Sequence, residues 1–305
     1  MTKDEFFSAL SNLSVWERDG ERAPHKPIML LYALAMLKHG HRQFDFSEIE
    51  KPIESILETI LPKRKNIHVH YPFWYLKTKG KTSGQTIWEI HGAEQIKFRK
   101  GKTEPLKSEL RNNHIEAGFT SDVLSLLDRE PEVIDISIQL LLDGQFPRSI
   151  QEDICAMLGI DDIDLSEACI PASIERKPRD PKFREKVLIA YKGECAVCGY
   201  SLRVKDRLAG IEAAHIKWHQ AGGPDVVPNA LSLCSTHHIL FDRGAFTIDK
   251  ELKIGVSDSM SGELLYDIVT RFNGASIRLP QRECHYPSEE FLSWHKEQVL
   301  VGELL

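Results

Sequence analysis

The stretch SLCSTHHILFD, from Ser232 to Asp242, decides how the rest of this sequence is interpreted. It places two adjacent histidines, His237 and His238, shortly after Cys234 at the predicted start of a helix. Neighbouring side chains on a helix point about 100° apart, so the two imidazole rings face different surroundings. We therefore expect His237 and His238 to belong to two different sites.

Two short ligand pairs suggest what the first site is. Cys195 and Cys198 form a C-x2-C pair, and after thirty-five intervening residues Cys234 and His237 form a C-x2-H pair. Together they offer the four soft or borderline ligands of a closed tetrahedral zinc site. The alternative is a group of core thiols beside a surface histidine, which leaves the coincidence of two pairs unexplained. We predict a structural Zn²⁺ site made of these four residues.

The second site concerns His238 and the polar residues that accompany it. Asp242 follows four residues later, so both side chains lie on one helical face, an arrangement that suits a second, harder cation. His215 and Asn229 complete the ordered series His215, Asn229, His238. A neutral imidazole can accept a proton from water near pH 7, and an amide can fix the orientation of that imidazole. A divalent ion held by His238 can neutralise charge on a phosphate and on its leaving oxygen.

Residues 194–249, which include ECAVCGY, EAAHIKW and STHHILFDRGAFTID, resemble the HNH endonuclease motif, a ββα-metal fold that hydrolyses phosphodiesters. The resemblance implies that His215 is the general base, Asn229 the orienting asparagine and His238 the metal-binding histidine. Many members of this family carry an Asp or His ligand directly before the base, where this chain has Ala214. The resemblance therefore leaves Glu212 or Asp242 to supply the missing ligand to Mg²⁺ or Mn²⁺.

Composition and charge fit a soluble protein with an uneven charge distribution. A chain of 305 residues suggests two domains, and we expect a cytoplasmic protein with no membrane segment because there is no long apolar run and no secretory signal pattern. The formal net charge is -6, yet residues 61–111 hold twelve Lys or Arg against four Asp or Glu. Segregated positive charge of this kind favours a polyanionic partner.

The chain divides at IPASIERKPRDPKFREK, residues 170–186, where prolines and charges replace apolar residues. We predict an N-terminal domain at residues 1–170, a linker at 171–182 and a C-terminal domain at 183–305. Helical periodicity dominates the first domain, and YPFWYLKTKGKTSGQTIWEI is predicted to form a small β-hairpin. The expected fold class is α+β: an α-rich N-terminal domain with a small hairpin, followed by the ββα-metal domain with its zinc knuckle.

Two stretches of the first half combine cations or aromatic rings with proline: RAPHKP at residues 22–27 and YPFWYL at residues 71–76. Proline rings and a tyrosine face can form an apolar wall that accepts a poorly hydrated, polarisable atom, whereas a strongly hydrated oxygen loses more on desolvation. With most of residues 1–165, they resemble the sulfur-binding domain of restriction enzymes that recognise phosphorothioate DNA. The resemblance implies a sulfur pocket with flanking DNA contacts, formed by Arg22, Pro24, His25, Lys26, Tyr71 and Pro72.

These features predict a modification-dependent restriction endonuclease that recognises phosphorothioate-modified double-stranded DNA and hydrolyses phosphodiester bonds. Two alternatives stay open. One is an HNH nuclease that reads methylated or hydroxymethylated DNA, which would require a base-flipping pocket. The other is a non-catalytic, zinc-containing DNA-binding regulator, which the alanine at position 214 supports. A homodimer is possible, because a single HNH site cuts one strand.

Overall fold

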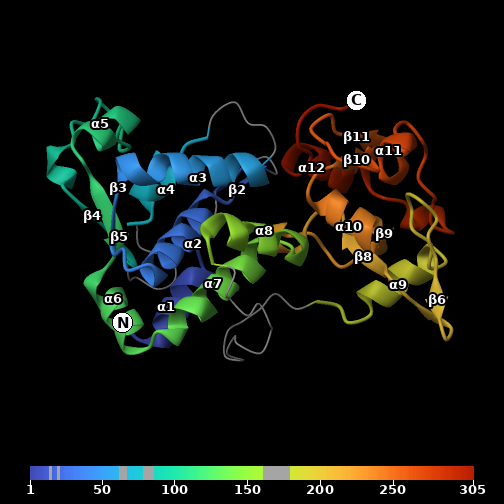
Figure 1. The fold of residues 1–305 in the computed structure, drawn as a ribbon, viewed down its shortest axis with the longest axis horizontal. Helices are drawn as coiled ribbons and strands as arrows, with labels where there is room; N and C mark the ends of the chain where they lie inside the picture. The colour runs from blue at the N-terminus through green and yellow to red at the C-terminus, as the bar shows by residue number, and fades with distance from the viewer. Residues whose placement is uncertain (14–15, 19–20, 62–66, 78–85, 161–178) are drawn as a thin grey trace.

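The computed structural model describes residues 1–13, 16–18, 21–61, 67–77, 86–160 and 179–305, with the backbone alone at 16–18 and 21–23. Figure 1 shows the helices of the N-terminal half on one side and a more compact C-terminal half on the other. Each half has a cluster of buried apolar side chains. The predicted linker falls largely within residues 161–178, outside the described residues, so the proposed domain boundaries stay predictions.

The N-terminal half is built around one almost entirely buried helix. This helix, α2 (His25–Lys38), has Pro27 in its first turn, where a proline costs no hydrogen bond. Most of its side chains from Ile28 to Ala35 are inaccessible to solvent. The surrounding helices confirm the predicted helical segments, apart from α5 (Lys107–Asn112), which was not predicted. The others are α1 (Lys3–Ser11), α3 (Phe46–Ile60), α6 (Ser121–Arg129), α7 (Glu132–Gln145) and α8 (Arg148–Leu158).

The predicted hairpin at residues 71–90 is wrong. Its first part is a short helix, α4 (His70–Tyr75), because Phe73 and Trp74 are buried against the helical core and packing overrides the strand preference of aromatic residues. Its last part is a strand in a three-stranded antiparallel sheet of order β3-β5-β4. The strands are β3 (Gln43–Asp45), β4 (Trp88–His91) and β5 (Glu116–Phe119).

The C-terminal half contains the expected ββα unit. Strand β8 (Ile211–His215) pairs antiparallel with β9 (Ala230–Cys234), and helix α10 (Ser235–Asp242) follows directly. Gly244 ends this region with φ 70° and lies so close to the Val299 carbonyl that no side chain fits there. The other elements are α9 (Phe183–Ala190), β6 (Arg203–Val204), β7 (Arg207–Leu208), β10 (Phe246–Ile248), β11 (Ile254–Val256), α11 (Leu265–Ile268) and α12 (Glu289–Gln298).

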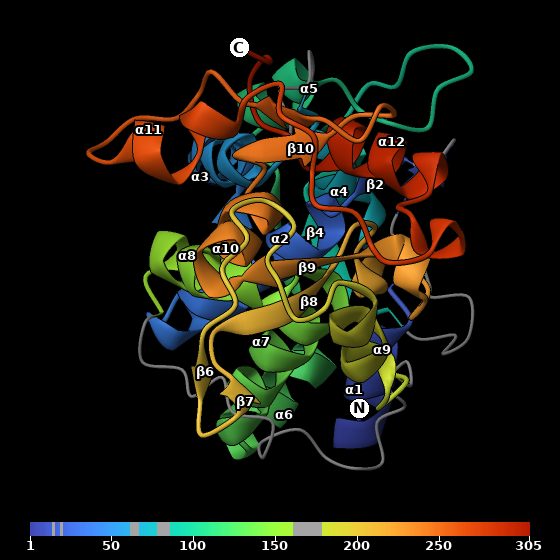
Figure 2. The ribbon, with the colours of Figure 1, turned by 90° about the vertical axis from the view of Figure 1, so that its right-hand side faces the viewer.

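The two halves share a packed interface. The indoles of Trp218 and Trp294, from the C-terminal half, contact each other at 5.8 Å between ring centroids and join the N-terminal apolar cluster. Helix α8 packs against α10, and the hairpin of β1 (Trp16–Arg18) and β2 (Glu21–Ala23) lies against α12. Figures 1 and 2 both show α8 beside α10. The N-terminal half thus reaches the helix that carries His238.

No helix in the described part of the chain combines the length and the apolar character needed to cross a membrane.

Candidate nuclease site, metal centre and DNA-reading surface

The predicted zinc quartet comes together in space. The ligand atoms of Cys195, Cys198, Cys234 and His237 all lie within 4.8 Å of one another. Representative separations are 3.6 Å from Cys195 Sγ to His237 Nδ1 and 4.0 Å between the sulfurs of Cys198 and Cys234. Zinc bonds of about 2.0–2.3 Å at tetrahedral angles need ligand atoms at such separations. The four residues therefore fit a structural Zn²⁺ ion.

The surroundings of the quartet also suit a metal. His237 directs Nδ1 to the sulfurs and donates from Nε2 to the Ile268 carbonyl at 2.8 Å, the outer contact that orients a metal-bound histidine. Hydrogen bonds from Cys198 and Cys234 lower the pKa of Cys195, which favours the thiolate that binds metal. This quartet is the one cluster of three or more possible ligands found among the described residues.

His238 lies between two carboxylates. Its Nδ1 is 2.6 Å from Glu212 Oε2, and its Nε2 is 3.3 Å from Asp242 Oδ2. Alternate side chains of a strand share a face, so Glu212 stands on the same face of β8 as Ala214 and reaches α10. Because the carboxylates flank opposite ring nitrogens, an ion on one nitrogen of His238 can have only one of them as its immediate neighbour.

The two carboxylates have different environments. The side chain of Glu212 is 45% exposed and that of Asp242 is 4% exposed. The hydrogen bond with His238 lowers the pKa of Glu212 to about 2, although partial burial opposes this shift. Burial raises the pKa of Asp242, against the effect of the neighbouring His238. Glu212 is thus an ionised group that faces solvent, whereas Asp242 is enclosed by protein.

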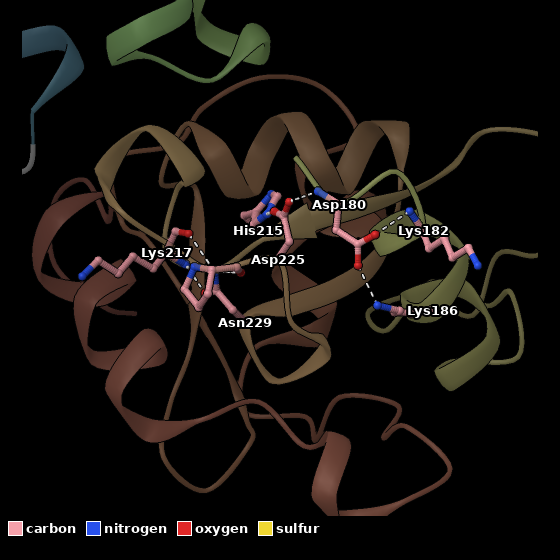
Figure 3. Close-up of polar contacts among 8 residues, drawn as sticks. Asp180, Lys182, Lys186, His215, Lys217, Asp225 and Asn229 are labelled. Carbon is pink, nitrogen blue, oxygen red and sulfur yellow. Dashed lines mark hydrogen bonds and ion pairs between the residues drawn. The ribbon is translucent and has the colours of Figure 1, made fainter. Parts of the chain in front are cut away.

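His215, at the end of β8, is held by the Asp225 carboxylate, which Figure 3 shows, and by the ring of Phe183. Its Nε2 lies 2.8 Å from Asp225 Oδ1, and the second oxygen of Asp225 accepts the backbone N–H of Asp180 at 2.6 Å. Phe183 stacks on the imidazole with 4.3 Å between centroids. Burial lowers the pKa of His215 to about 4, although the hydrogen bond with Asp225 opposes the shift. The ring is therefore neutral at pH 7 and fixed in orientation.

Asn229 is fully buried and holds a loop rather than a ring. Its Oδ1 accepts the N–H of Lys217 at 2.8 Å, and its Nδ2 donates to the carbonyls of Lys217 and Pro224, each at 3.0 Å (Figure 3). The amide thereby closes the loop that follows His215. The contact that fixes the imidazole itself comes from Asp225 and not from Asn229.

No hydrogen bond or ion pair joins His215 to His238 within the described residues. Glu212, the partner of His238, precedes His215 by three residues on β8, which corresponds to about 10 Å along a strand. Because side chains alternate along a strand, Glu212 and His215 also leave opposite faces of β8.

The residues expected at the sulfur pocket lie on two helices that pack together. Pro24, His25 and Lys26 form the start of α2, and Tyr71 and Pro72 lie in α4. The Tyr71 ring is 39% exposed and is backed by His70 at 4.2 Å and His68 at 4.9 Å between centroids. Pro72 is buried, and burial lowers the pKa of Lys26. The side chain of Arg22 lies outside the described residues.

Comparison with known proteins identifies both halves. Residues 3–163 match the family model described as ScoMcrA-like, DNA sulfur-binding domain. The chain belongs to this family. Residues 195–249 match an HNH endonuclease model, so the sulfur-binding domain is joined to a DNA endonuclease domain of a class that typically uses a divalent metal ion. No curated protein matches the chain.

Several solved structures are similar to part of this chain. One is the sulfur-binding domain of ScoMcrA complexed with phosphorothioated DNA, with 20% identity and a TM-score of 0.42 over 53% of this chain and 98% of that one. Another is the type IV phosphorothioation-dependent restriction endonuclease ScoMcrA, with 20% identity and a TM-score of 0.40 over 68% and 35% of the two chains. A third is the modification-dependent TagI restriction endonuclease, with 26% identity and a TM-score of 0.30 over 40% and 38%.

Two cations of the sulfur-binding domain form ion pairs with a buried carboxylate of the same domain. Arg111 donates two hydrogen bonds to the buried carboxylate of Glu50, and Lys107 contacts the same carboxylate at 3.1 Å. Other cations of the basic window are exposed, namely Lys97, Arg99, Lys100 and Lys102. Lys63, Arg64, Lys65, Lys79 and Lys81 lie outside the described residues. Arg99 and Lys102 lie 3.7 Å and 3.9 Å from the Glu104 carboxylate, and all four exposed cations can attract DNA phosphates from solvent.

Three contacts of the endonuclease domain were not predicted from the sequence. Asp225 and Phe183 hold His215, and Ser149 of the sulfur-binding domain donates a hydrogen bond to Asp242. Asp225 stands four residues before Asn229 in GGPDVVPN, which was the one local signal available. Phe183 and Ser149 come from distant segments, and no spacing in the sequence links them to the site.

Proposed function

We propose that this chain is a cytoplasmic, phosphorothioate-dependent restriction endonuclease. Its sulfur-binding domain would recognise a phosphorothioate linkage in double-stranded DNA, and its HNH domain would hydrolyse a phosphodiester bond. One observation carries the proposal: the chain that matches the DNA sulfur-binding family holds His238 between two carboxylates, and the strand that supplies Glu212 ends in an oriented, neutral His215.

In the proposed reaction His215 is the general base. The neutral ring donates from Nε2 to Asp225, so its lone pair lies on Nδ1, which makes no hydrogen bond to any described residue. Nδ1 accepts a proton from the water that attacks phosphorus. Asp225 keeps the ring in the required tautomer, and Phe183 restricts its rotation.

For the catalytic metal we propose Glu212 and Nδ1 of His238 as ligands. Glu212 is ionised and exposed, as a ligand beside DNA must be, whereas the carboxylate of Asp242 is enclosed. Asp242 would then contact Nε2 from behind and orient the ring. When bound, Mg²⁺ or Mn²⁺ neutralises negative charge on the phosphate and on the departing 3′ oxygen.

For the sulfur pocket we propose the surface where the start of α2 meets α4. Tyr71 offers an exposed aromatic face, and Pro24, His25 and Pro72 are the other residues implied for the wall. Lys26 and Arg22 would contact flanking phosphates or bases. An apolar wall discriminates sulfur from oxygen because the oxygen is more strongly hydrated.

The test is cleavage of two duplexes of identical sequence, one with an Rp phosphorothioate linkage and one without, in Mg²⁺ or Mn²⁺. Cleavage of the sulfur-bearing duplex alone is the expected result. Equal cleavage of both duplexes would support the nuclease activity but refute its dependence on sulfur. Absence of cleavage in either metal would refute the enzymatic proposal and favour a DNA-binding regulator.

Cleavage of both strands provides a further distinction. The chain carries one candidate HNH centre, so we propose that a double-strand break requires two copies acting together. Linear product that rises with the square of enzyme concentration supports a dimer. Nicked product alone supports a monomer.

Tyr71→Ala is expected to reduce the preference for sulfur over oxygen at least tenfold, which corresponds to about 1.4 kcal/mol. The reason is loss of the exposed ring that would contact the sulfur. The measurement is the ratio of dissociation constants for the two duplexes. Tyr266→Ala, which removes an exposed tyrosine of the C-terminal half, is the control and should leave the ratio unchanged. Equal weakening of both affinities by Tyr71→Ala would show that this ring is only structural.

Asp225→Asn is expected to slow cleavage on the order of 10²-fold, because the amide no longer fixes the His215 tautomer. The carboxylate favours the imidazolium form, so its loss lowers the pKa of His215 further. The acid limb of the pH–rate profile should therefore move to lower pH in single-turnover measurements. Asp206→Asn, in an exposed turn, is the control. A shift of the acid limb to higher pH would contradict the assignment.

A further inference from the structure

The endonuclease site receives a hydrogen bond from the sulfur-binding domain. The hydroxyl of Ser149, in the first turn of α8, donates to Asp242 Oδ2 at the end of α10. Ser149 lies within the segment matched to the sulfur-binding family, and Asp242 lies within the HNH segment. This contact is therefore a direct link between the two functional parts of the chain.

From Asp242 the polar contacts continue to the candidate metal site. Asp242 Oδ2 is 3.3 Å from His238 Nε2, and His238 Nδ1 is 2.6 Å from Glu212 Oε2. The other oxygen of Glu212 accepts the hydroxyl of Ser235 at 2.6 Å. An unbroken series of contacts thus runs from α8 of the sulfur-binding domain to the exposed carboxylate of β8.

Burial makes the first contact of this series important. Asp242 is nearly inaccessible, so solvent cannot replace a lost hydrogen bond at its carboxylate. A carboxylate held by a neighbouring hydroxyl has a defined position, and an imidazole that contacts it takes a defined orientation. Without the hydroxyl, the position of Asp242 and the orientation of His238 are less restricted.

The surrounding interface keeps α8 in place beside α10. Gln220 donates to the Phe146 carbonyl at 3.2 Å, and Arg243 contacts Asp153 at 2.8 Å. The Trp218 indole is buried within the apolar cluster of the sulfur-binding domain. The Ser149 hydroxyl is therefore presented by a packed interface and not by an isolated surface contact.

We propose that Ser149 is a positioning residue of the endonuclease: it holds Asp242 so that His238 directs Nδ1 toward Glu212. The sulfur-binding domain is thereby a structural part of the nuclease site as well as the reader of the DNA. This inference rests on the proposed function for the identity of the site but concerns the geometry of His238.

The experiment compares Ser149→Ala, Ser149→Thr and Asp153→Asn in the full chain. Asp153→Asn removes an exposed ion pair of the same interface without touching the Asp242 carboxylate, so it is the matched control. Three quantities are measured: Mn²⁺ affinity by electron paramagnetic resonance without DNA, affinity for the phosphorothioate duplex, and the single-turnover cleavage rate at saturating Mn²⁺. Melting temperatures verify that each variant is folded.

Ser149→Ala is expected to weaken Mn²⁺ binding and to slow cleavage roughly tenfold, the lower end of the 10- to 100-fold cost of losing a residue that contacts a metal ligand directly, because Ser149 acts on His238 through Asp242. Affinity for the duplex should be unchanged, Ser149→Thr should restore both losses, and Asp153→Asn should behave as the native chain. The inference would be overturned if folded Ser149→Ala bound Mn²⁺ as tightly as the native chain. It would also be overturned if Asp153→Asn lost as much Mn²⁺ affinity and cleavage rate as Ser149→Ala. Because Mn²⁺ binding is measured without DNA, it decides this inference even if the native chain does not cleave phosphorothioate DNA.

Discussion

Replacement of His215 with alanine is expected to abolish cleavage of phosphorothioate DNA and to leave binding of that DNA intact. A positioned general base contributes about 10²–10⁴-fold to a rate. The imidazole contacts Asp225 and stacks on Phe183, both in the C-terminal half. The alanine substitution therefore leaves the packing of the sulfur-binding domain unchanged. Single-turnover cleavage and a binding titration with the phosphorothioate duplex provide the two measurements.

His39→Ala is the control for this variant, because it removes an exposed histidine at the end of α2. It should cleave and bind as the native chain does. If the His215 variant still cuts at the native rate, the base is another residue. If it loses DNA binding together with cleavage, His215 belongs to the DNA-binding surface and the assigned role is wrong.

Removal of zinc, or the Cys195→Ser substitution, is expected to unfold the C-terminal half. Zinc binding contributes about 10–16 kcal/mol in small zinc domains, which is comparable to the whole stability of an ordinary domain. Cys195 is fully buried, and its sulfur is 3.6 Å from His237 Nδ1. The serine variant should therefore lose a cooperative melting transition and expose the C-terminal half to limited proteolysis.

Cys284→Ser is the matched control, because Cys284 is an exposed thiol in the same half. Its melting curve should be unchanged. Bound zinc should be absent from the Cys195 variant and stoichiometric in the native chain by elemental analysis. An unchanged melting curve for Cys195→Ser would contradict a structural role for the quartet.

Local features were predicted well because their physical cause is local. The longer helices of the N-terminal half followed from apolar periodicity, and the start of α2 followed from a proline that fits a first helical turn. The quartet of Cys195, Cys198, Cys234 and His237 followed from two short ligand pairs, since residues three positions apart must be near each other. The β8–β9–α10 order followed from a recognisable motif.

Features that depend on packing were predicted less well. The aromatic run YPFWYL was assigned to a strand from its composition, but the burial of Phe73 and Trp74 selects a helix. Asn229 was expected to orient the imidazole, whereas its amide satisfies backbone groups of the adjacent loop. A sequence lists the groups that can hydrogen-bond but not which of them meet.

The sequence by itself determined the residue types of both candidate centres, the adjacency of His237 and His238, and the family of the N-terminal domain. Only the tertiary structure decided which nitrogen of His238 faces which carboxylate, which acid holds His215, and that Ser149 contacts Asp242. The physical reason is that spacing along a helix or strand fixes direction over a few residues. Contacts between α8 and α10 depend on how two distant surfaces pack, which short-range spacing does not specify.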